Sequence, residues 1–222
     1  MRTLDDAWLW YEDTKKTLRR MERMGNRYWD RIPWDAPPWR GDRHFIDLTK
    51  EAIVRAAVNA SVHLDDLAVV VLFSVFEANV RGAILDQMQA EEPQYQHRAI
   101  RDAIRAARDR IGEGSFYAVL SSFKGSDNNL IEDVNQVRKY RNWVSHGRRG
   151  AQPALVIPPV AFERLKKCMT LFFPPVPEEW VAISAYYVWE EETRPGARDS
   201  VYWNKGKTQL QEMMRTGELS LP

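Results

Sequence analysis

The sequence is poor in the features that cross-link small proteins or anchor them to membranes. Its 222 residues include one cysteine, Cys168, which excludes an internal disulfide and fits a reducing compartment. Its most apolar run, Leu67 to Phe76, has ten residues, about half the length of a bilayer span. The charged N-terminus lacks the apolar segment of a signal peptide. We therefore expect a cytoplasmic protein with no membrane contact.

Sequence patterns for metal ions and bound phosphates are also missing. There is no glycine-rich phosphate-binding loop. Asp65, Asp66 and Glu77 could hold a magnesium ion in principle, but acids such as Asp65 and Asp66 are typical of the N-terminal end of a helix, and this is the interpretation we favour. Three of the four histidines show no metal-ligand spacing with one another or with the cysteine: His44, His63 and His97. We expect neither a metal ion nor another cofactor.

The overall charge gives no sign of a nucleic-acid partner. With a net charge of +1, any such site must come from local clustering of basic residues. The nine tryptophans and eight tyrosines gather mostly in the first 40 and last 45 residues. We expect these aromatic side chains to pack two terminal extensions onto the core, and the alternative is stacking on a partner or on nucleobases.

The hydrophobic pattern is helical throughout, without strand-like alternation, and predicts an all-α protein. An ordered loop rich in tryptophan and proline is predicted at 28–43. The domain interpretation is an extension at 1–59, a core at 60–175 and a second extension at 176–222. Helices are predicted at 4–24 (ended by Gly25 and Asn26), from 47 to a break at Asn59 and Ser61, at 62–88, from Pro93 to about 112, and at 115–123, 128–145, 160–172, 178–191 and 207–215.

The stretch from Val137 to Arg149, VRKYRNWVSHGRR, holds five basic side chains and no acid. On a helix that begins near Asp127 and ends before Gly147, four apolar residues form one stripe: Leu130, Val134, Val137 and Val144. Arg141 falls in the middle of that stripe. A guanidinium in this position is costly unless it is paired or faces a polar interface. Arg141 therefore marks the candidate site.

His146 follows Arg141 by five residues, about 140° round an ideal helix. The two side chains share a site only if the helix ends near His146 or a second copy of the helix lies alongside. The alternative role for Arg141 is a structural pair with a buried acid. Glu77 lies on an apolar stripe and is the candidate partner, although it could instead pair with Arg81 at i,i+4.

The segment Arg141-Asn142-Trp143-Val144-Ser145-His146 resembles the signature of HEPN domains, in which a histidine follows an arginine after four to six residues, the first of them polar. Residues 72–79, LFSVFEAN, resemble the phenylalanine- and glutamate-bearing helix of many such proteins. The resemblance covers roughly residues 60–175. It implies a helical bundle, usually a homodimer with the two motifs facing each other. Many members are metal-independent endoribonucleases in toxin–antitoxin, abortive-infection or CRISPR-linked defence, and others are non-catalytic binding proteins.

The resemblance also implies roles for individual residues. His146 would act as general acid or base, Arg141 would hold the scissile phosphate, and Asn142 would orient the phosphate or the histidine. Glu77 and Ser145 would support these groups. The expected RNA-binding residues are Arg138, Lys139, Arg148 and Arg149.

The expected partners are RNA, a second copy of the chain, and an antitoxin or nucleotidyltransferase. Two alternatives remain open. One is a non-catalytic module that binds RNA or protein, and the other is a helical antitoxin or immunity-type protein with an acidic partner.

Overall fold

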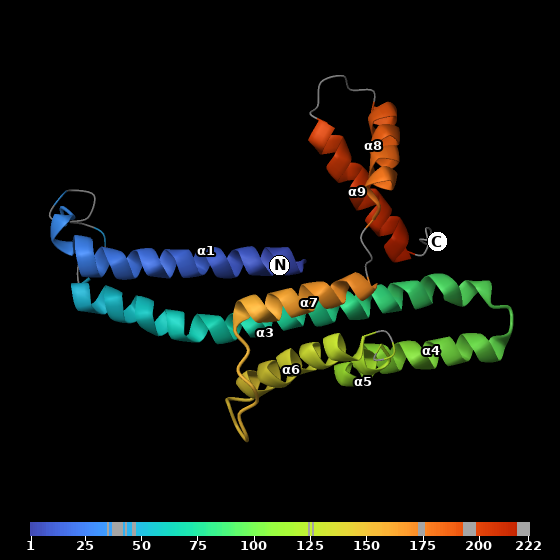
Figure 1. The fold of residues 1–222 in the computed structure, drawn as a ribbon, viewed down its shortest axis with the longest axis horizontal. Coiled ribbons are helices and arrows are strands. Elements are labelled where there is room, and N and C mark those ends of the chain that lie inside the picture. The colour runs from blue at the N-terminus through green and yellow to red at the C-terminus, as the bar shows by residue number, and fades with distance from the viewer. Residues whose placement is uncertain are drawn as a thin grey trace. The chain divides into compact units, whose positions relative to one another are not determined.

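The computed structural model describes residues 1–34, 36, 42, 44–45, 48–123, 125, 127–172, 176–192 and 199–216. Within these residues every regular element is a helix, which confirms the all-α class. The α-helices are α1 (Leu4–Arg23), α3 (Lys50–Glu91), α4 (Arg98–Glu113), α5 (Phe116–Ser121), α6 (Asn128–Ser145), α7 (Pro158–Phe172), α8 (Glu178–Glu192) and α9 (Asp199–Thr216) (Figure 1). A π-helical turn (Met24–Tyr28) and 3₁₀ turns (Trp29–Arg31 and Glu92–Gln94) complete the set.

The chain divides into two compact units, which are described separately. The first contains residues 1–75 and 136–163, and the second contains residues 76–135 and 164–222.

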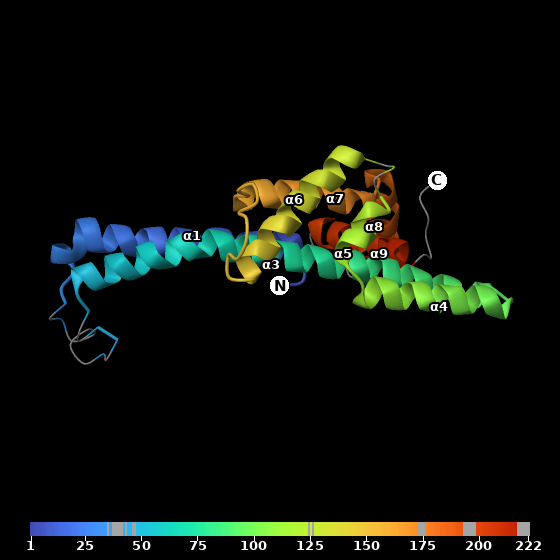
Figure 2. The ribbon, with the colours of Figure 1, turned by 90° about the horizontal axis from the view of Figure 1, so that it is seen from below.

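In the first unit, α1 lies along the first part of α3 (Figures 1 and 2). Tyr11 is buried against Leu64 and Ala68 of α3. Trp8 stacks on Phe162, with ring centres 4.8 Å apart. These contacts give the N-terminal aromatic residues the packing role that the sequence predicts.

The first α-helix ends at Arg23, one residue before the predicted bound, but Gly25 does not stop helical structure as predicted. The chain stays helical through the π-helical turn, and Gly25 itself is buried. A Cβ atom at this position would overlap Val54 Cγ2 and lie 3.0 Å from Ile53 Cγ2. The glycine is therefore needed for the close approach of this turn to α3.

The predicted break at Asn59 and Ser61 is also wrong, because α3 runs without interruption for 42 residues. The Ser61 hydroxyl donates to the Ala57 carbonyl at 2.8 Å, so this polar residue is accommodated inside the helix. Asp65 and Asp66 consequently lie in the middle of a helix and not at its start. The predicted boundary between residues 59 and 60 falls inside α3.

With the turn that follows it, α3 is long and apolar enough to cross a membrane by length and composition alone. The core helix of a soluble protein passes the same test of length and composition.

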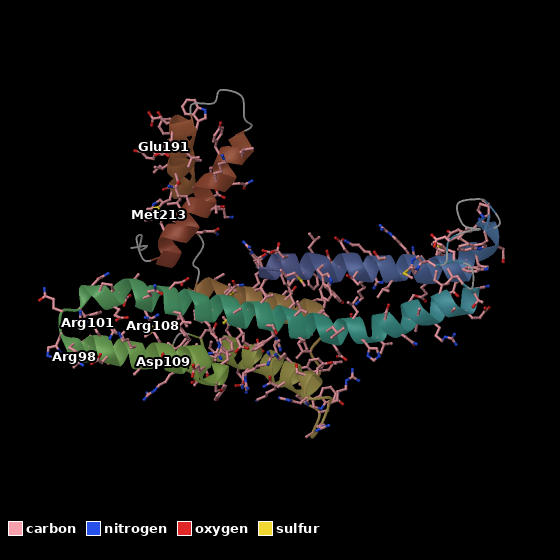
Figure 3. The ribbon with its side chains drawn as sticks, turned by 180° about the vertical axis from the view of Figure 1, so that it is seen from behind. Arg98, Arg101, Arg108, Asp109, Glu191 and Met213 are labelled. Atoms are coloured by element: carbon pink, nitrogen blue, oxygen red, sulfur yellow. The ribbon has the colours of Figure 1, made fainter. Side chains whose placement is uncertain are left out.

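In the second unit, the end of α3 lies beside α4 (Figures 1 and 2). Arg81 joins them: it pairs with Glu77 at 2.9 Å and donates to the Gly114 carbonyl at 2.8 Å. Glu92 accepts from Arg105 at 2.7 Å and from Arg108 at 3.1 Å. Figure 3 shows Arg108 among the charged side chains along α4.

The prediction that Pro93 begins α4 is wrong, because Pro93 lies in the preceding 3₁₀ turn. The helix starts at Arg98, and His97 is its N-cap, since its Nδ1 accepts from the Ala99 N–H at 3.2 Å. Histidine is an unusual N-cap, whereas proline is common in the first turn of a helix. The sequence therefore indicated Pro93 as the start of α4.

The helices α8 and α9 form a hairpin held by an apolar cluster of Val176, Val181 and Leu210, with Trp180 packed against it. The second helix begins at residue 199 and not at 207 as predicted. Several aromatic residues of α8 are exposed, and the expectation that C-terminal aromatics pack on the core stays a prediction. The exposed ones are Tyr186, Tyr187 and Trp189.

Some sequence predictions lie outside the described residues. These concern most of the tryptophan- and proline-rich loop predicted at 28–43. At the start of that loop, Trp34 is described: its Nε1 donates to the Trp29 carbonyl at 3.0 Å.

Two helical glycines should respond in opposite directions to alanine. A Cβ at Gly82 would meet no atom within 4 Å, so Gly82→Ala should stabilise the protein by about 0.5–1 kcal/mol. A Cβ at Gly206 would lie 2.5 Å from the backbone nitrogen of Ala185 in α8. We expect Gly206→Ala to destabilise it by about 1–3 kcal/mol. Urea unfolding measures both, and a midpoint of Gly206→Ala that does not fall below that of the wild type would contradict the close approach of α8 and α9.

Candidate functional site

The C-terminal end of α6 carries most of the residues that the sequence predicts to be functional, and its beginning and end match the prediction. Asp127 caps the first turn, because its Oδ1 accepts from the Leu130 N–H at 2.9 Å. At the other end Gly147 has a φ of 72°, and its N–H donates to the Val144 carbonyl at 3.0 Å. The Arg148 N–H donates to the Trp143 carbonyl at 2.8 Å. These two bonds form a Schellman motif, which confirms the helix end expected at Gly147.

Arg141 lies on the apolar side of α6, as the projection predicts. Val137, one turn before it, is fully buried, and Arg141 itself is half-buried. Its guanidinium carbon lies 5.7 Å from the ring centre of Phe73 in α3, within the range of cation–π attraction. Its Nη1 donates to Asn142 Oδ1 at 3.0 Å. The guanidinium is thus held against a buried aromatic ring by a neighbour on the same helix.

His146 is the first residue after α6, and its side chain is exposed. Its backbone N–H donates to the Asn142 carbonyl at 2.9 Å. Asn142 therefore contacts both ends of the motif, through its side chain to Arg141 and through its carbonyl to His146. Ser145 is also exposed.

A polar cluster that the sequence did not reveal ties the turn after α6 to α3. Asp66 Oδ1 accepts from the Tyr140 hydroxyl at 2.6 Å, and Asp66 Oδ2 forms an ion pair with Arg148. The guanidinium carbon of Arg148 also lies 5.5 Å from the ring centre of Trp143. Arg148, which the sequence predicts to bind RNA, is therefore engaged within the protein.

Burial raises the pKa of Tyr140 to about 12, and the hydrogen bond to the Asp66 carboxylate adds to the increase. Because this pKa is above the ordinary value of 10.0, the folded state holds the phenol proton more tightly than the unfolded state does. The resulting stabilisation is complete below pH 10 and is lost as the pH rises to about 12.

We therefore expect the stability of the wild type to fall more steeply between pH 9 and pH 12 than that of Tyr140→Phe. Urea midpoints measured across this range test the expectation. Parallel curves for the two proteins would show that Tyr140 titrates normally.

The other residues predicted to be functional are Arg138, Lys139, Arg149 and Glu77, and they differ in burial and in the unit to which they belong. Lys139 and Arg149 are exposed, and Arg138 is half-buried. Glu77 belongs to the second unit, where it pairs with Arg81 at 2.9 Å. This is the i,i+4 alternative, and a role for Glu77 in orienting Arg141 or Arg138 stays a prediction.

Among the described residues, no group of three or more histidine, cysteine, aspartate or glutamate side chains could hold a metal ion. Comparison of the chain with protein-family models, curated proteins and solved structures finds no match.

Proposed function

We propose that the protein is a metal-independent endoribonuclease of the HEPN type. The observation that carries the proposal is the end of α6, where a guanidinium held against Phe73 and Asn142 lies on the last turn before an exposed histidine. Arginine binds phosphate through its planar set of donors, and histidine exchanges protons near neutral pH. These two groups can serve the attacking step of phosphodiester cleavage by a neighbouring hydroxyl, which needs a cation on the phosphate and a group that removes a proton.

In the proposed reaction, His146 removes the proton from a ribose 2′-OH, and the 2′-oxygen attacks the adjacent phosphorus. The bond from phosphorus to the 5′-oxygen breaks, and that oxygen takes up a proton. Arg141 binds the non-bridging oxygens and stabilises the charge that develops on them. The products are a 2′,3′-cyclic phosphate and a 5′-hydroxyl.

The 5′-oxygen needs a proton donor, and a second copy of the chain would supply one. In a homodimer with the two α6 ends facing each other, one His146 acts as base and the other as acid. Asn142 keeps Arg141 aligned, and Ser145 and Glu77 have supporting roles.

RNA affinity in this proposal comes from exposed basic residues, which contact backbone phosphates without reading sequence. Lys139 in the last turns of α6 and Arg149 in the turn beyond it are exposed, and the half-buried Arg138 precedes Lys139 in the chain. The proposed setting is the cytoplasm, where such an activity would serve as a toxin or defence effector controlled by an antitoxin or nucleotidyltransferase partner.

The deciding experiment is incubation of the purified protein with end-labelled RNA in EDTA. We expect cleavage to products ending in 2′,3′-cyclic phosphate. We expect no cleavage of DNA of the same sequence, because DNA lacks the attacking hydroxyl. Dependence on a divalent metal, or products with a 3′-hydroxyl, would contradict the mechanism.

The second candidate is a non-catalytic HEPN-like module that binds RNA or a protein. The exposed aromatic residues of α8 favour it, because clustered apolar side chains on a surface mark interaction sites. In that case His146→Ala would leave binding intact, whereas charge reversal at Arg148 and Arg149 would weaken it. An antitoxin- or immunity-type protein would instead form a salt-sensitive complex with an acidic partner and show no affinity for RNA.

A further inference from the structure

Two adjacent acids in α3, Asp65 and Asp66, make the same kind of contact to different parts of the first unit. Asp65 Oδ1 accepts from the Tyr11 hydroxyl at 2.8 Å and from Lys15 Nζ at 2.9 Å. Both donors are in α1. Asp66 likewise accepts a hydrogen bond from a tyrosine hydroxyl and forms an ion pair with an arginine. Each acid therefore binds one tyrosine and one cation.

Neighbouring residues on a helix point about 100° apart, so the two carboxylates face different elements. Asp65 ties α1 to α3. Asp66 ties α3 to the last turns of α6, through Tyr140, and to the turn beyond it, through Arg148. Of these two acids, Asp66 is the one that makes direct contacts to the segment carrying the candidate site.

The turn after α6 needs such a support. Arg148 has a φ of 59°, in the left-handed region that residues with a side chain rarely adopt. Its guanidinium is fixed by the Asp66 carboxylate, whose side chain is only 13% exposed, and by the ring of Trp143. His146 lies two residues before Arg148. A change in the backbone at Arg148 would therefore disturb the bond from its N–H to the Trp143 carbonyl, which closes the helix end at which His146 lies.

We propose that Asp66 is a positioning residue, which fixes the turn after α6 through Arg148 and Tyr140 and so orients the imidazole of His146 relative to Arg141. This inference rests on the proposed function, because it assigns a catalytic purpose to the position of His146. Asp66 does not contact RNA in this role, and it acts only through the turn that it holds.

The proposal separates two arginines that are adjacent in the sequence. Arg148 is engaged with Asp66 and serves to hold the turn, so its loss should lower kcat. Arg149 is exposed and free to meet a phosphate, so its loss should raise KM and leave kcat nearly unchanged. A non-specific basic surface would give the same effect at both positions.

The test compares three variants with the wild type in RNA cleavage: Asp66→Asn, Asp66→Glu and Asp65→Asn. Asparagine keeps the shape of aspartate but lacks the charge, and Asp65→Asn is the matched control because it removes an equivalent carboxylate from α3. We expect Asp66→Asn to lower kcat by about 10- to 100-fold, since a small displacement of a catalytic group has an effect of this size. Asp66→Glu should restore part of the rate, and Asp65→Asn should keep it within about twofold of the wild type.

Trypsin digestion gives a readout that does not depend on activity, because the turn contains Arg148 and Arg149. We expect cleavage in this turn to be faster in Asp66→Asn than in the wild type and unchanged in Asp65→Asn. Circular dichroism melting confirms that each variant is folded at the assay temperature. If Asp66→Asn does not fold, Tyr140→Phe, which removes one of the two contacts, should show smaller changes in the same directions.

The outcomes separate this proposal from the proposed function. Full activity in a folded Asp66→Asn overturns the positioning role and leaves the ribonuclease assignment intact. An inactive wild type overturns the ribonuclease assignment and, with it, the catalytic purpose given to Asp66. Equal trypsin rates in all variants would show that Asp66 does not hold the turn.

Discussion

His146→Ala is expected to reduce the rate of RNA cleavage by about 10²- to 10⁴-fold, the usual contribution of a general acid or base. The imidazole is exposed at the end of α6, so its removal should leave the fold intact. Single-turnover cleavage of end-labelled RNA in EDTA measures the effect. His63→Ala is a matched control, because His63 is also an exposed histidine but lies in α3.

Arg141→Ala should have an effect of similar size, because in the proposed mechanism the guanidinium stabilises the charge on the phosphate. Arg141→Lys should restore little of the rate. A lysine can neither stack a planar group on Phe73 nor offer two parallel donors to a phosphate. Wild-type rates in both His146→Ala and Arg141→Ala would exclude this site, and an equal loss in His63→Ala would point to unfolding.

Phe73→Ala should destabilise the protein by about 3–5 kcal/mol, the usual cost of removing a buried phenylalanine ring. Phe73 is fully buried in α3, and its ring lies beneath the Arg141 guanidinium. The change should therefore also disturb the candidate site. Urea unfolding measures the loss of stability.

A double-mutant cycle separates the contact with Arg141 from the loss of apolar burial. The cycle combines Phe73→Leu with Arg141→Met, two changes that preserve much of the volume. We expect a coupling energy of about 0.5–2 kcal/mol if the ring holds the guanidinium. Additive effects would mean that the two side chains are neighbours without a significant interaction.

The sequence predicted α6 well because local signals define it. Asp127 caps its start, Gly147 ends it with a positive φ, and the apolar stripe between them has helical spacing. The unusual place of Arg141 on that stripe also came from local periodicity. Patterns of this kind depend on residues within one or two turns of each other, which a single sequence records directly.

The features that the sequence did not predict depend on contacts between distant residues. Asp66 is separated from Tyr140 by 74 positions and from Arg148 by 82. Nothing local distinguishes it from Asp65, which holds a different helix. Gly25 is a second example. In the sequence it suggests the end of a helix, but in the structure it allows the close approach of Val54 in the facing helix. Asn59 and Ser61 favour helix ends, but this local preference does not interrupt α3, which continues through both residues.

The only cysteine also decides how this protein can be labelled. Cys168 is fully buried, and burial, with the nearby Asp127 charge, raises the pKa of its thiol to about 12. At neutral pH only about one molecule in 10⁵ carries the reactive thiolate there. We therefore expect the Cys168 thiol not to react with maleimide reagents at neutral pH. A cysteine introduced at the exposed position of Arg149 would take up a fluorophore selectively and report on ligand approach to the end of α6.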